Sequence, residues 1–216
     1  MKILFHTLII LSVCLTACAQ TKTAKQSETG QKNNQSSMKT EKITLGSGCF
    51  WCTEAIFQQV KGVIKVTSGY SGGHVPNPTY EQVCDKNTGH AEVCQLEYDP
   101  ALVTVDEILE IFWQTHDPTT LNRQGNDVGP QYRSVVFYHN ELQKERASLF
   151  KSELDKSGAY DAPIVTTIEP YTNFYVAENY HQDYYNRNGK EPYCYFVIRP
   201  KLEKFEKAFK NKMKSN

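Results

Sequence analysis

A short cysteine-containing stretch, Gly46 to Glu54, has the residue types of a reactive-thiol site. Residues 42–45 alternate polar and apolar side chains as in a strand, and residues 54–60 have a helical pattern. Cys49 is therefore expected where a strand turns into a helix. The first backbone N–H groups of a helix lack intrahelical partners and carry the positive end of its dipole, which stabilises a thiolate. We therefore expect a lowered pKa and a nucleophilic sulfur at Cys49.

The neighbours of this cysteine add further features to the stretch. Gly46 and Gly48 allow a substrate or another backbone segment to approach closely. Phe50 and Trp51 are either the walls of a small apolar pocket or ordinary core residues. Cys52 completes a C-x-x-C spacing, which is typical of redox and metal sites. One reactive sulfur is expected, and the kind of reaction depends on the rest of the chain.

The N-terminal residues have the pattern of an export signal. The apolar run from Ile3 to Leu15 is too short to span a bilayer, which predicts a signal peptide over residues 1–17. Leu15-Thr16-Ala17-Cys18 resembles the bacterial lipobox, in which the cysteine receives the lipid. Plain secretion, with cleavage after Ala17 or Ala19, is the alternative.

The next segment, residues 18–40, is rich in Thr, Lys, Gln, Ser and Asn and has almost nothing to bury. Such a composition predicts a disordered tether between the lipid-carrying cysteine and the folded part. We therefore expect a protein of the bacterial cell envelope that is anchored by lipid alone, facing the periplasm or the outer surface.

Length and charge limit the class of protein. The 216 residues suffice for one domain with a substantial core. The 24 basic and 24 acidic residues give a formal net charge of zero, which does not support nucleic-acid binding. Long heptad repeats are missing, so we expect a monomer.

The folded part is expected to start at residue 41 and to belong to the α+β class. Strands are predicted at 42–45, 62–70, 91–98 and 134–138, with helices at 51–60 and 104–113. This β-α-β-β-α-β order is that of the two-layer ferredoxin-like plait, in which two helices cover one face of an antiparallel sheet.

Further elements are added to this plait. A helix is predicted at 141–156, a strand at 164–168 and a terminal helix at 202–212, with an irregular Tyr-rich region at 171–195. Two long loops are expected within the plait, at 71–89 and 117–132. Long loops in a compact domain are usually functional, so both are expected to converge on the reactive cysteine.

Six motifs between residues 42 and 195 are similar to those of the peptide methionine sulfoxide reductase family, A type (MsrA). They are the stretches 48–54, 69–73, 77–80, 89–92, 124–127 and 131–134. Several motifs in order are far more specific than one C-x-x-C spacing. The resemblance implies that residues 41–216 form a thiol-dependent oxidoreductase. Its Cys49 would reduce methionine-S-sulfoxide, in oxidised proteins or as the free amino acid, and become a sulfenic acid.

The resemblance also supplies an acid. Sulfoxide oxygen is a poor leaving group until it is protonated, so an acid is needed beside the nucleophile. The resemblance assigns this role to Glu92. An apolar setting next to Trp51 would keep the carboxyl neutral. An exposed charge at the start of a strand is the alternative for Glu92.

The resemblance further implies a set of substrate-binding residues. Tyr80 and Tyr132 would donate hydroxyl hydrogen bonds to the sulfoxide oxygen, and Asp127 would line the site. Phe50 and Trp51 would receive the methyl group of the substrate. A pocket that fixes both methyl and oxygen accepts one epimer at sulfur, the S form in this family.

The family recycles its sulfenic acid through a second cysteine and a thioredoxin-type protein, with no bound cofactor or metal. We favour Cys194 as the recycling cysteine, because it follows Asn188-Gly189 and can swing onto Cys49. Cys52 is the second choice, since C-x-x-C cysteines can be bridged. Many family members have glycine where this chain has Cys52.

Two other readings compete with the reductase. One is a thioredoxin-like disulfide oxidoreductase that uses Cys49 and Cys52. The other is a non-catalytic lipoprotein that binds zinc through its cysteines, but Cys84 and Cys94 do not form a second short pair. The histidines of the mature chain lack metal-binding spacings as well, so structural hydrogen bonding is expected for them.

Overall fold

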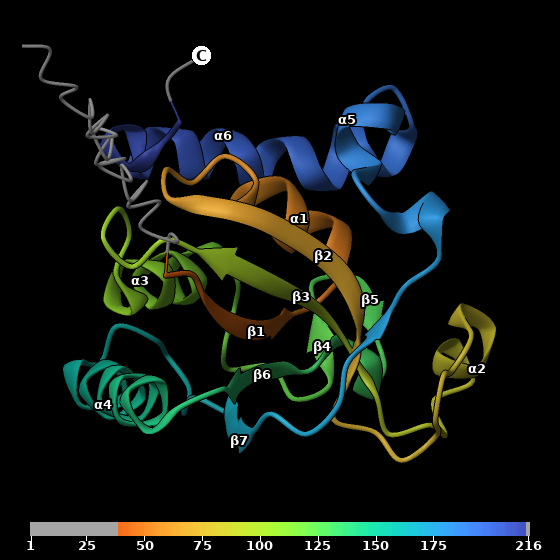
Figure 1. The fold of residues 1–216 in the computed structure, drawn as a ribbon, viewed down its shortest axis with the longest axis horizontal. Coiled ribbons are helices and arrows are strands. Elements are labelled where there is room, and N and C mark those ends of the chain that lie inside the picture. The colour runs from red at the N-terminus through yellow and green to blue at the C-terminus, as the bar shows by residue number, and fades with distance from the viewer. Residues whose placement is uncertain (1–38, 215–216) are drawn as a thin grey trace, which may run out of the picture. The chain divides into compact units, whose positions relative to one another are not determined.

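A computed structural model describes residues 39–214. The predicted signal peptide, Cys18 and nearly all of the predicted tether lie outside the described residues. A six-stranded sheet is the centre of the fold, with the strand order β7-β6-β1-β3-β2-β8 (Figure 1). Its strands are β1 (Glu41–Ser47), β2 (Val63–Ser71), β3 (Ala91–Tyr98), β6 (Ser134–Tyr138), β7 (Thr167–Pro170) and β8 (Tyr175–Val176).

The sheet is mixed rather than purely antiparallel. Strand β1 pairs antiparallel with β3 and β6, and β2 pairs antiparallel with β3 and β8. The edge strand β7, however, runs parallel to β6. The predicted α+β class is confirmed, and the four strands for which an antiparallel sheet was expected pair antiparallel. The additional strand predicted at 164–168 is found as β7, shifted to residues 167–170. The chain reaches β7 through a long helix, which lets it return in the same direction as β6.

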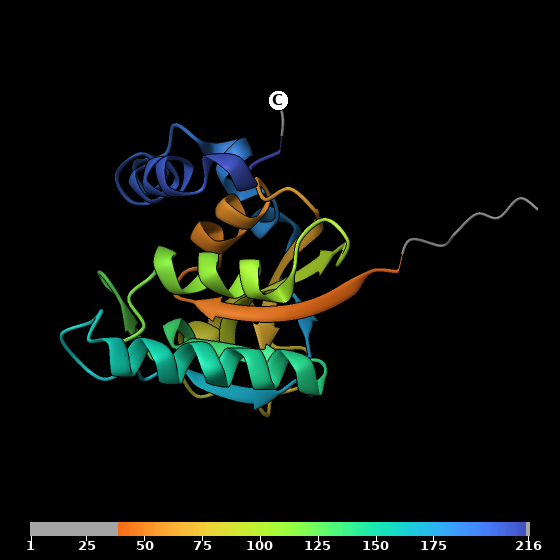
Figure 2. The same ribbon diagram turned by 90° about the vertical axis from the view of Figure 1, so that its left-hand side faces the viewer.

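Four longer helices surround the sheet: α1 (Phe50–Phe57), α3 (Val105–Thr115), α4 (Glu141–Ser157) and α6 (Arg199–Ala208). Helices α3 and α4 lie side by side, and α6 packs along α1 (Figures 1 and 2). The capping box of α3 is present, since the Thr104 hydroxyl accepts the N–H of Glu107 at 3.2 Å and the Glu107 carboxylate accepts the N–H of Thr104 at 2.8 Å.

The two faces of the sheet carry hydrophobic clusters of different size. The main core lies between the sheet and helices α1, α3 and α6, and Cys94 and Leu96 of β3 point into it. The intervening residue Val93 points to the opposite face, where it packs with Val135, Phe137 and Phe174 in a smaller cluster. Alternation along β3 therefore places Glu92, two residues before Cys94, on the face covered by α1.

Several segments expected to be irregular contain short elements. The first long loop includes helix α2 (Tyr80–Cys84), and the second includes the hairpin of β4 (Arg123–Gln124) and β5 (Asp127–Val128), followed by the 3-10 turn η1 (Pro130–Tyr132). Helix α2 has its own capping box at Thr79. Its five residues are too few to produce a helical pattern in the sequence.

The C-terminal part is more regular than expected. It contains the 3-10 turn η2 (Asn179–His181), α5 (Tyr184–Asn188), a π-helical turn η3 (Cys194–Ile198) that runs into α6, and the 3-10 turn η4 (Lys210–Lys212). The terminal helix therefore starts before the predicted residue 202. Buried Glu54 of α1 holds this region, because its carboxylate accepts the N–H groups of Asp183 and Tyr184 at 2.8 and 3.1 Å.

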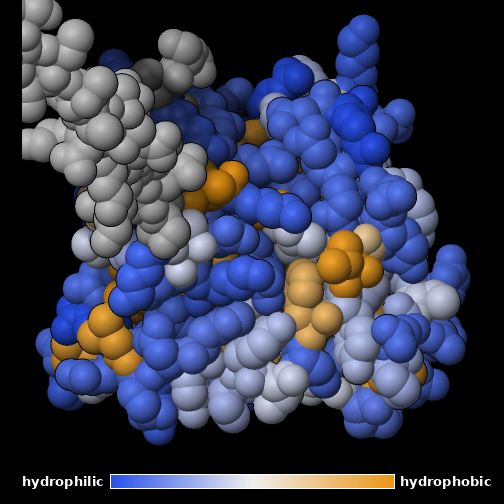
Figure 3. All heavy atoms as spheres, in the orientation of Figure 1, coloured by the Kyte–Doolittle hydropathy of each residue, from blue (hydrophilic) through white to orange (hydrophobic). Residues whose placement is uncertain are grey.

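The surface seen in Figure 3 is mostly hydrophilic, with apolar residues in small groups. Leu121, Val128 and Phe196 are among the exposed apolar side chains. Within residues 39–214, no helix combines the length and the apolar character needed to cross a membrane.

Candidate active site

Cys49 stands where β1 ends and α1 begins, as the sequence predicted. It is the N-cap residue of α1, and its side chain is only 6% exposed. Gly48 before it has a φ of +93°, and a Cβ there would lie 2.5 Å from the Cβ of Gln124. Only glycine fits such a backbone conformation and such a close neighbour without strain. The tight turn therefore fixes the position at which the cysteine enters the helix.

The sulfur borders a small cavity of about 170 Å³. Its walls come from α1, α2, β3, the hairpin, η1 and the residue before η3, and the lining residues are Cys49, Phe50, Trp51, Tyr80, Glu92, Asp127, Tyr132 and Tyr193. Every residue predicted for catalysis or substrate binding is in this set. The expected convergence of the two long loops on Cys49 is confirmed.

Glu92 lines the same cavity as Cys49 and is buried, with 2% of its surface exposed. Its Oε2 accepts the backbone N–H of Phe50 at 3.1 Å, so the carboxyl occupies the first donor of α1. Burial raises the pKa of Glu92 to about 8, and the hydrogen bond from Phe50 offsets only part of that rise. Glu92 is therefore mostly protonated at neutral pH. The exposed-charge alternative is wrong.

The lowered pKa expected for Cys49 is also wrong. Burial raises the pKa of its thiol well above the ordinary value, and contact with Cys52 and the nearby Glu92 raises it further. The helix N-terminus does not compensate, because its first N–H is already bonded to Glu92. The hydrogen bond from Cys49 instead lowers the pKa of Cys52, to about 7, with a contribution from Lys201. Cys49 is thus a buried thiol at rest.

Three tyrosines face the cavity. Burial raises the pKa of Tyr80, Tyr132 and Tyr193, so all three keep their hydroxyl protons at neutral pH. The Tyr193 hydroxyl donates a 2.8 Å hydrogen bond to Oδ2 of Asp127 and also contacts Cys49. The three tyrosines therefore bring neutral O–H groups to the cavity, and that of Tyr193 is already donated to Asp127.

The aromatic wall is held by residues of the C-terminal region. The Trp51 indole stacks on Tyr184 with ring centres 3.6 Å apart, and its Nε1 donates to Nδ1 of His181 at 3.2 Å. His181 also packs against Phe50, with ring centres 5.0 Å apart. Because Nδ1 accepts this bond, His181 is neutral in the structure, and burial lowers its pKa. These contacts hold the rings of Phe50 and Trp51 in place beside the Cys49 sulfur.

Comparisons with known proteins agree with this geometry. The family model described as peptide methionine sulfoxide reductase matches residues 41–213. The chain belongs to the peptide methionine sulfoxide reductase family.

Relatives within this family cover most of the chain. A Saccharolobus solfataricus protein, "Peptide methionine sulfoxide reductase MsrA", is 56% identical over 174 residues, which is 81% of this chain and 97% of the relative. A Thermus thermophilus protein of the same name is 52% identical over 174 residues, covering 81% and 98% of the two chains. The chain is therefore an enzyme, an oxidoreductase of the methionine sulfoxide reductase type.

Solved structures of the family have a similar fold. Reduced Mxr1 from Saccharomyces cerevisiae has a TM-score of 0.66 at 36% identity, over 73% of this chain and 90% of that one. Methionine sulfoxide reductase A of Corynebacterium diphtheriae has a TM-score of 0.63 at 36% identity, over 69% and 75%.

The two cysteines predicted for recycling lie outside the reductase cavity. Cys52 is one helical turn from Cys49 and 3% exposed. Cys194 is fully buried at the first residue of η3, so it is not on the flexible tail that the sequence suggested. The cysteines of residues 39–214 are all free thiols. In the same part of the chain, no group of three His, Cys, Asp or Glu side chains has a metal-binding arrangement.

Sequence reasoning missed Tyr193 as part of the site and did not commit to His181. Both belong to the Tyr-rich region, where many tyrosines follow one another without a helix or strand pattern. The only signal for Tyr193 was its place next to Cys194. For Glu178, which accepts the Tyr80 N–H and the Tyr70 hydroxyl at 2.9 Å each, the sequence contains no signal.

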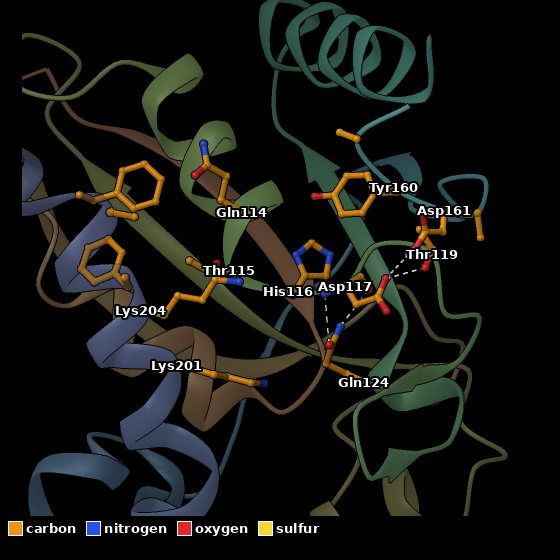
Figure 4. A pocket seen from close by; sticks show the side chains of 15 residues that line it. Gln114, Thr115, His116, Asp117, Thr119, Gln124, Tyr160, Asp161, Lys201 and Lys204 are labelled. Carbon is orange, nitrogen blue, oxygen red and sulfur yellow. Dashed lines mark hydrogen bonds between the residues drawn. The ribbon is translucent and has the colours of Figure 1, made fainter. Parts of the chain in front are cut away.

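A second, larger cavity of about 510 Å³ lies between α6, the C-terminal end of α3 and the segment after α4 (Figure 4). Lys201 and Lys204 of α6 line it, together with His116, Asp117 and Gln124. Gln124 is the residue that contacts Gly48, so this cavity reaches the far side of the turn that carries Cys49. None of the predicted catalytic or substrate-binding residues faces it.

Proposed function

We propose that this enzyme reduces the S epimer of methionine sulfoxide, in proteins or free, with Cys49 as nucleophile and Glu92 as acid. The observation that carries the proposal is the buried, protonated Glu92, which is hydrogen-bonded to the residue directly after Cys49. A carboxyl held neutral at this position can give a proton to a substrate oxygen.

The chemistry follows from the groups in the cavity. The Cys49 sulfur attacks the sulfoxide sulfur while Glu92 donates its proton to the sulfoxide oxygen. The oxygen ends on Cys49 as a sulfenic acid, methionine leaves, and the thiol proton of Cys49 restores Glu92. Because both groups start neutral, the exchange creates no net charge in the small cavity.

The other residues that line the cavity orient the substrate in this proposal. The hydroxyls of Tyr80 and Tyr132 donate hydrogen bonds to the sulfoxide oxygen on the side of Glu92. The methyl group packs on Phe50 and Trp51, whose rings are fixed by His181 and Tyr184. With oxygen and methyl on separate walls and Cys49 on a third, only one configuration at sulfur presents its sulfur to the thiol.

An assay with the two epimers of a methionine sulfoxide peptide tests this function. The wild-type enzyme is expected to reduce the S epimer and to leave the R epimer intact. The Cys49→Ser variant should lose at least about three orders of magnitude in rate, since a serine hydroxyl is a far weaker nucleophile than a cysteine thiol. Equal reduction of both epimers, or activity that survives this substitution, contradicts the proposal.

We also propose that the sulfenic acid is recycled through an intramolecular disulfide that includes Cys194 and is then reduced by a thioredoxin-type dithiol protein. Reduction of sulfoxide consumes two electrons from the cysteine, and dithiols supply two electrons when they reduce a disulfide. The free thiols near Cys49 support this scheme, which needs no bound cofactor. Mass mapping of the enzyme after one substrate equivalent should reveal a bridge containing Cys194.

The ferredoxin-like plait is proposed as the description of the central unit. The four strands β6-β1-β3-β2 are adjacent in that order and pair antiparallel, and α1 and α3 share one core with them. Strands β7 and β8 extend this unit at both edges.

Export and lipid attachment at Cys18 are proposed from the lipobox-like residues 15–18, with residues 18–40 as tether. The protein would be a lipid-anchored monomer of the bacterial cell envelope. Mass spectrometry of the N-terminal peptide from the membrane fraction tests this, because cleavage after Ala17 without a lipid on Cys18 contradicts the anchor.

A further inference from the structure

A group of lysines lies at the end of the central sheet where β1 begins. At this end, Glu41 of β1 is opposite Tyr98 of β3, which is in turn opposite Val63 of β2. The C-terminal segment reaches the same place, because the carbonyl of Lys212 accepts the N–H of Lys61 at 2.8 Å. Figure 1 shows the start of β1, the start of β2 and the end of α6 together on its left side. We call this region the basic end, and its lysines are Lys39, Lys42, Lys61, Lys65, Lys210, Lys212 and Lys214.

The positive charges of the basic end are more exposed than its negative charges. All of its lysines except Lys212 are exposed. Its buried or half-buried acids are Glu41, Glu97, Asp99, Asp106 and Glu107. Glu107 is paired with Lys212, and Asp106 is paired with Arg146. Exposed Glu206, one turn before Lys210 on α6, offsets one charge. The basic end therefore presents net positive charge to the solvent, although the formal net charge of the whole chain is zero.

Two aliphatic side chains are exposed among these lysines. Ile64 of β2 is 48% exposed, and Leu102, in the turn after β3, is 56% exposed. Leu102 lies next to the glycine two residues before Ile64, because a Cβ on Gly62 would be 2.9 Å from the Leu102 Cβ. Aliphatic side chains surrounded by lysines are typical of surfaces that bind lipid headgroups, since the apolar groups enter the boundary of the acyl chains while the ammonium groups stay at the phosphates.

The part of the chain that precedes the fold joins it at the same end. Residues 18–40 are the proposed tether, and they lead directly into β1. A flexible tether of this length has an end-to-end distance of roughly 25–30 Å. It contains four lysines and one glutamate, so its charge has the same sign as that of the basic end. A lipid on Cys18 would therefore keep the basic end at a high effective concentration beside the membrane.

Building on the proposed lipid attachment, we propose that the basic end binds the anionic headgroups of the membrane to which Cys18 is anchored. The exposed lysines attract lipid phosphates, and each contributes about fivefold to the affinity. Ile64 and Leu102 enter the headgroup region between them. Both the sign of the charge and the place where the tether joins the fold favour a lipid surface as the partner.

This arrangement places the reductase cavity on the side of the domain away from the membrane. Strand β1 starts at the basic end and finishes at Ser47, two residues before Cys49. At about 3.3 Å per residue, Cys49 is on the order of 25 Å from Glu41. The cavity then receives oxidised polypeptides from the aqueous side, while the opposite end of the sheet rests on the headgroups.

Lysine acylation measures which part of the domain contacts the membrane. The lipidated protein is purified, reconstituted in phosphatidylcholine vesicles with or without phosphatidylglycerol, and treated with a water-soluble acylating reagent. We expect Lys61, Lys65 and Lys210 to react about five- to tenfold more slowly on the anionic vesicles. Lys86 and Lys190, exposed lysines in the segments after α2 and α5, are internal references and should react equally on both. About 0.5 M salt should remove the protection. Equal rates for the basic end on both kinds of vesicle overturn the proposal.

Charge reversal tests whether the lysines themselves cause the contact. The double variant Lys61→Glu with Lys210→Glu should reduce the protection of Lys65 at least about threefold. Lys86→Glu with Lys190→Glu is the matched control and should leave this protection unchanged. Both double variants should reduce a methionine sulfoxide peptide in solution at the wild-type rate, which shows that they are folded. Protection that survives the first double variant, or that is lost equally in both, contradicts the proposal.

The mass of the N-terminal peptide separates this inference from the lipid attachment on which it builds. If Cys18 is lipidated and the basic end is not protected, only the basic end fails. If Cys18 has no lipid, the proposed anchor fails, and the secreted protein is sedimented with the same vesicles. Binding to anionic vesicles that is lost in Lys61→Glu with Lys210→Glu then supports the basic end as a membrane-binding surface, and an absence of binding overturns it.

Discussion

The two cavities differ in what they do to the groups around them. The smaller one, about 170 Å³, contains a buried carboxyl and a buried thiol whose pKa values are both raised. The larger one, about 510 Å³, has exposed Asp117, Asp161 and Lys204 on its walls. These charged groups are in contact with water, whereas the carboxyl and the thiol of the smaller cavity are desolvated.

His116 is a desolvated group of the larger cavity. Burial lowers its pKa to about 4. Both ring nitrogens are occupied, however, because Nδ1 donates to Phe112 O at 2.6 Å and Nε2 accepts from Ser134 at 2.7 Å. The protonated Glu92 has only one bond from the protein backbone and faces a cavity. A group is therefore expected to be reactive when it is desolvated and still has a free hydrogen-bonding site. The size of a cavity does not identify such a group.

Substituting the acid of the smaller cavity should give the largest effect. Glu92→Gln keeps the shape and a hydrogen-bonding group but removes the transferable proton. We expect sulfoxide reduction to fall by about two to four orders of magnitude, the range typical of general acid catalysis. Single-turnover release of methionine measures this effect.

The matched control for this substitution is Asp161→Asn, an exposed carboxyl of the larger cavity. It should leave the rate within about twofold of wild type. A Glu92→Gln enzyme with nearly normal single-turnover kinetics would show that another group protonates the oxygen.

The same carboxyl should make stability depend on pH. The folded-state pKa of about 8 is above that of an ordinary carboxyl, so below about pH 4.5 both folded and unfolded states are protonated and the group contributes nothing. Between about pH 4.5 and 8 only the unfolded state ionises, which destabilises the fold by up to a few kcal/mol. Glu92→Gln should remove this loss.

Denaturant unfolding of wild type and Glu92→Gln at pH 5 and pH 8 measures the difference. The variant is expected to gain stability relative to wild type as pH rises, while Asp161→Asn shows no such gain. If the two curves run parallel across this range, Glu92 is not buried in its neutral form.

How far sequence could reach is shown by Glu92 and Cys49. The motif resemblance located Glu92, and the period-two pattern of β3 put it on the face of Cys94. The raised pKa of Cys49 was not predictable, because it depends first on burial by segments distant in the sequence and then on the neighbouring Cys52 and Glu92. Local patterns reveal that a helix begins just after Cys49. They do not reveal that Glu92, 42 residues after Phe50, accepts the first N–H of this helix.

The C-terminal region was the least predictable part. Residues 171–195 lack a helical or alternating pattern, yet Glu54 and Gln182 anchor them through backbone N–H and C=O groups. No sequence pattern indicates that the side chains of Glu54 and Gln182 form hydrogen bonds with these backbone groups. The long helices and central strands, with capping boxes and clear periodicity, were predicted because their signals are local.

The tyrosines of the smaller cavity should have intermediate effects. Tyr80→Phe and Tyr132→Phe each remove one O–H donor while retaining the ring, and we expect each to lower sulfoxide reduction about tenfold. The double variant should lose about two orders of magnitude or more, since one donor partly compensates for the other. Comparison of kcat and KM locates the loss.

Tyr160→Phe is the matched control, since Tyr160 lines the larger cavity and donates to Trp113 O at 2.7 Å. It should affect stability by about 1 kcal/mol without changing the rate. If both cavity tyrosine variants keep wild-type kinetics, the sulfoxide oxygen is bound by Glu92 alone.

The smallest effect is expected at Lys204. This exposed lysine lines the larger cavity and takes part in none of the ion pairs within residues 39–214. Lys204→Ala should therefore change the free energy of unfolding by less than about 0.5 kcal/mol and the turnover of a methionine sulfoxide peptide by less than about twofold. A marked rise in KM for a long oxidised polypeptide, with the short peptide unaffected, would mean that the larger cavity binds substrate residues away from the sulfoxide. The two cavities would then differ in function, because the reaction takes place in the smaller one and the larger one binds the polypeptide.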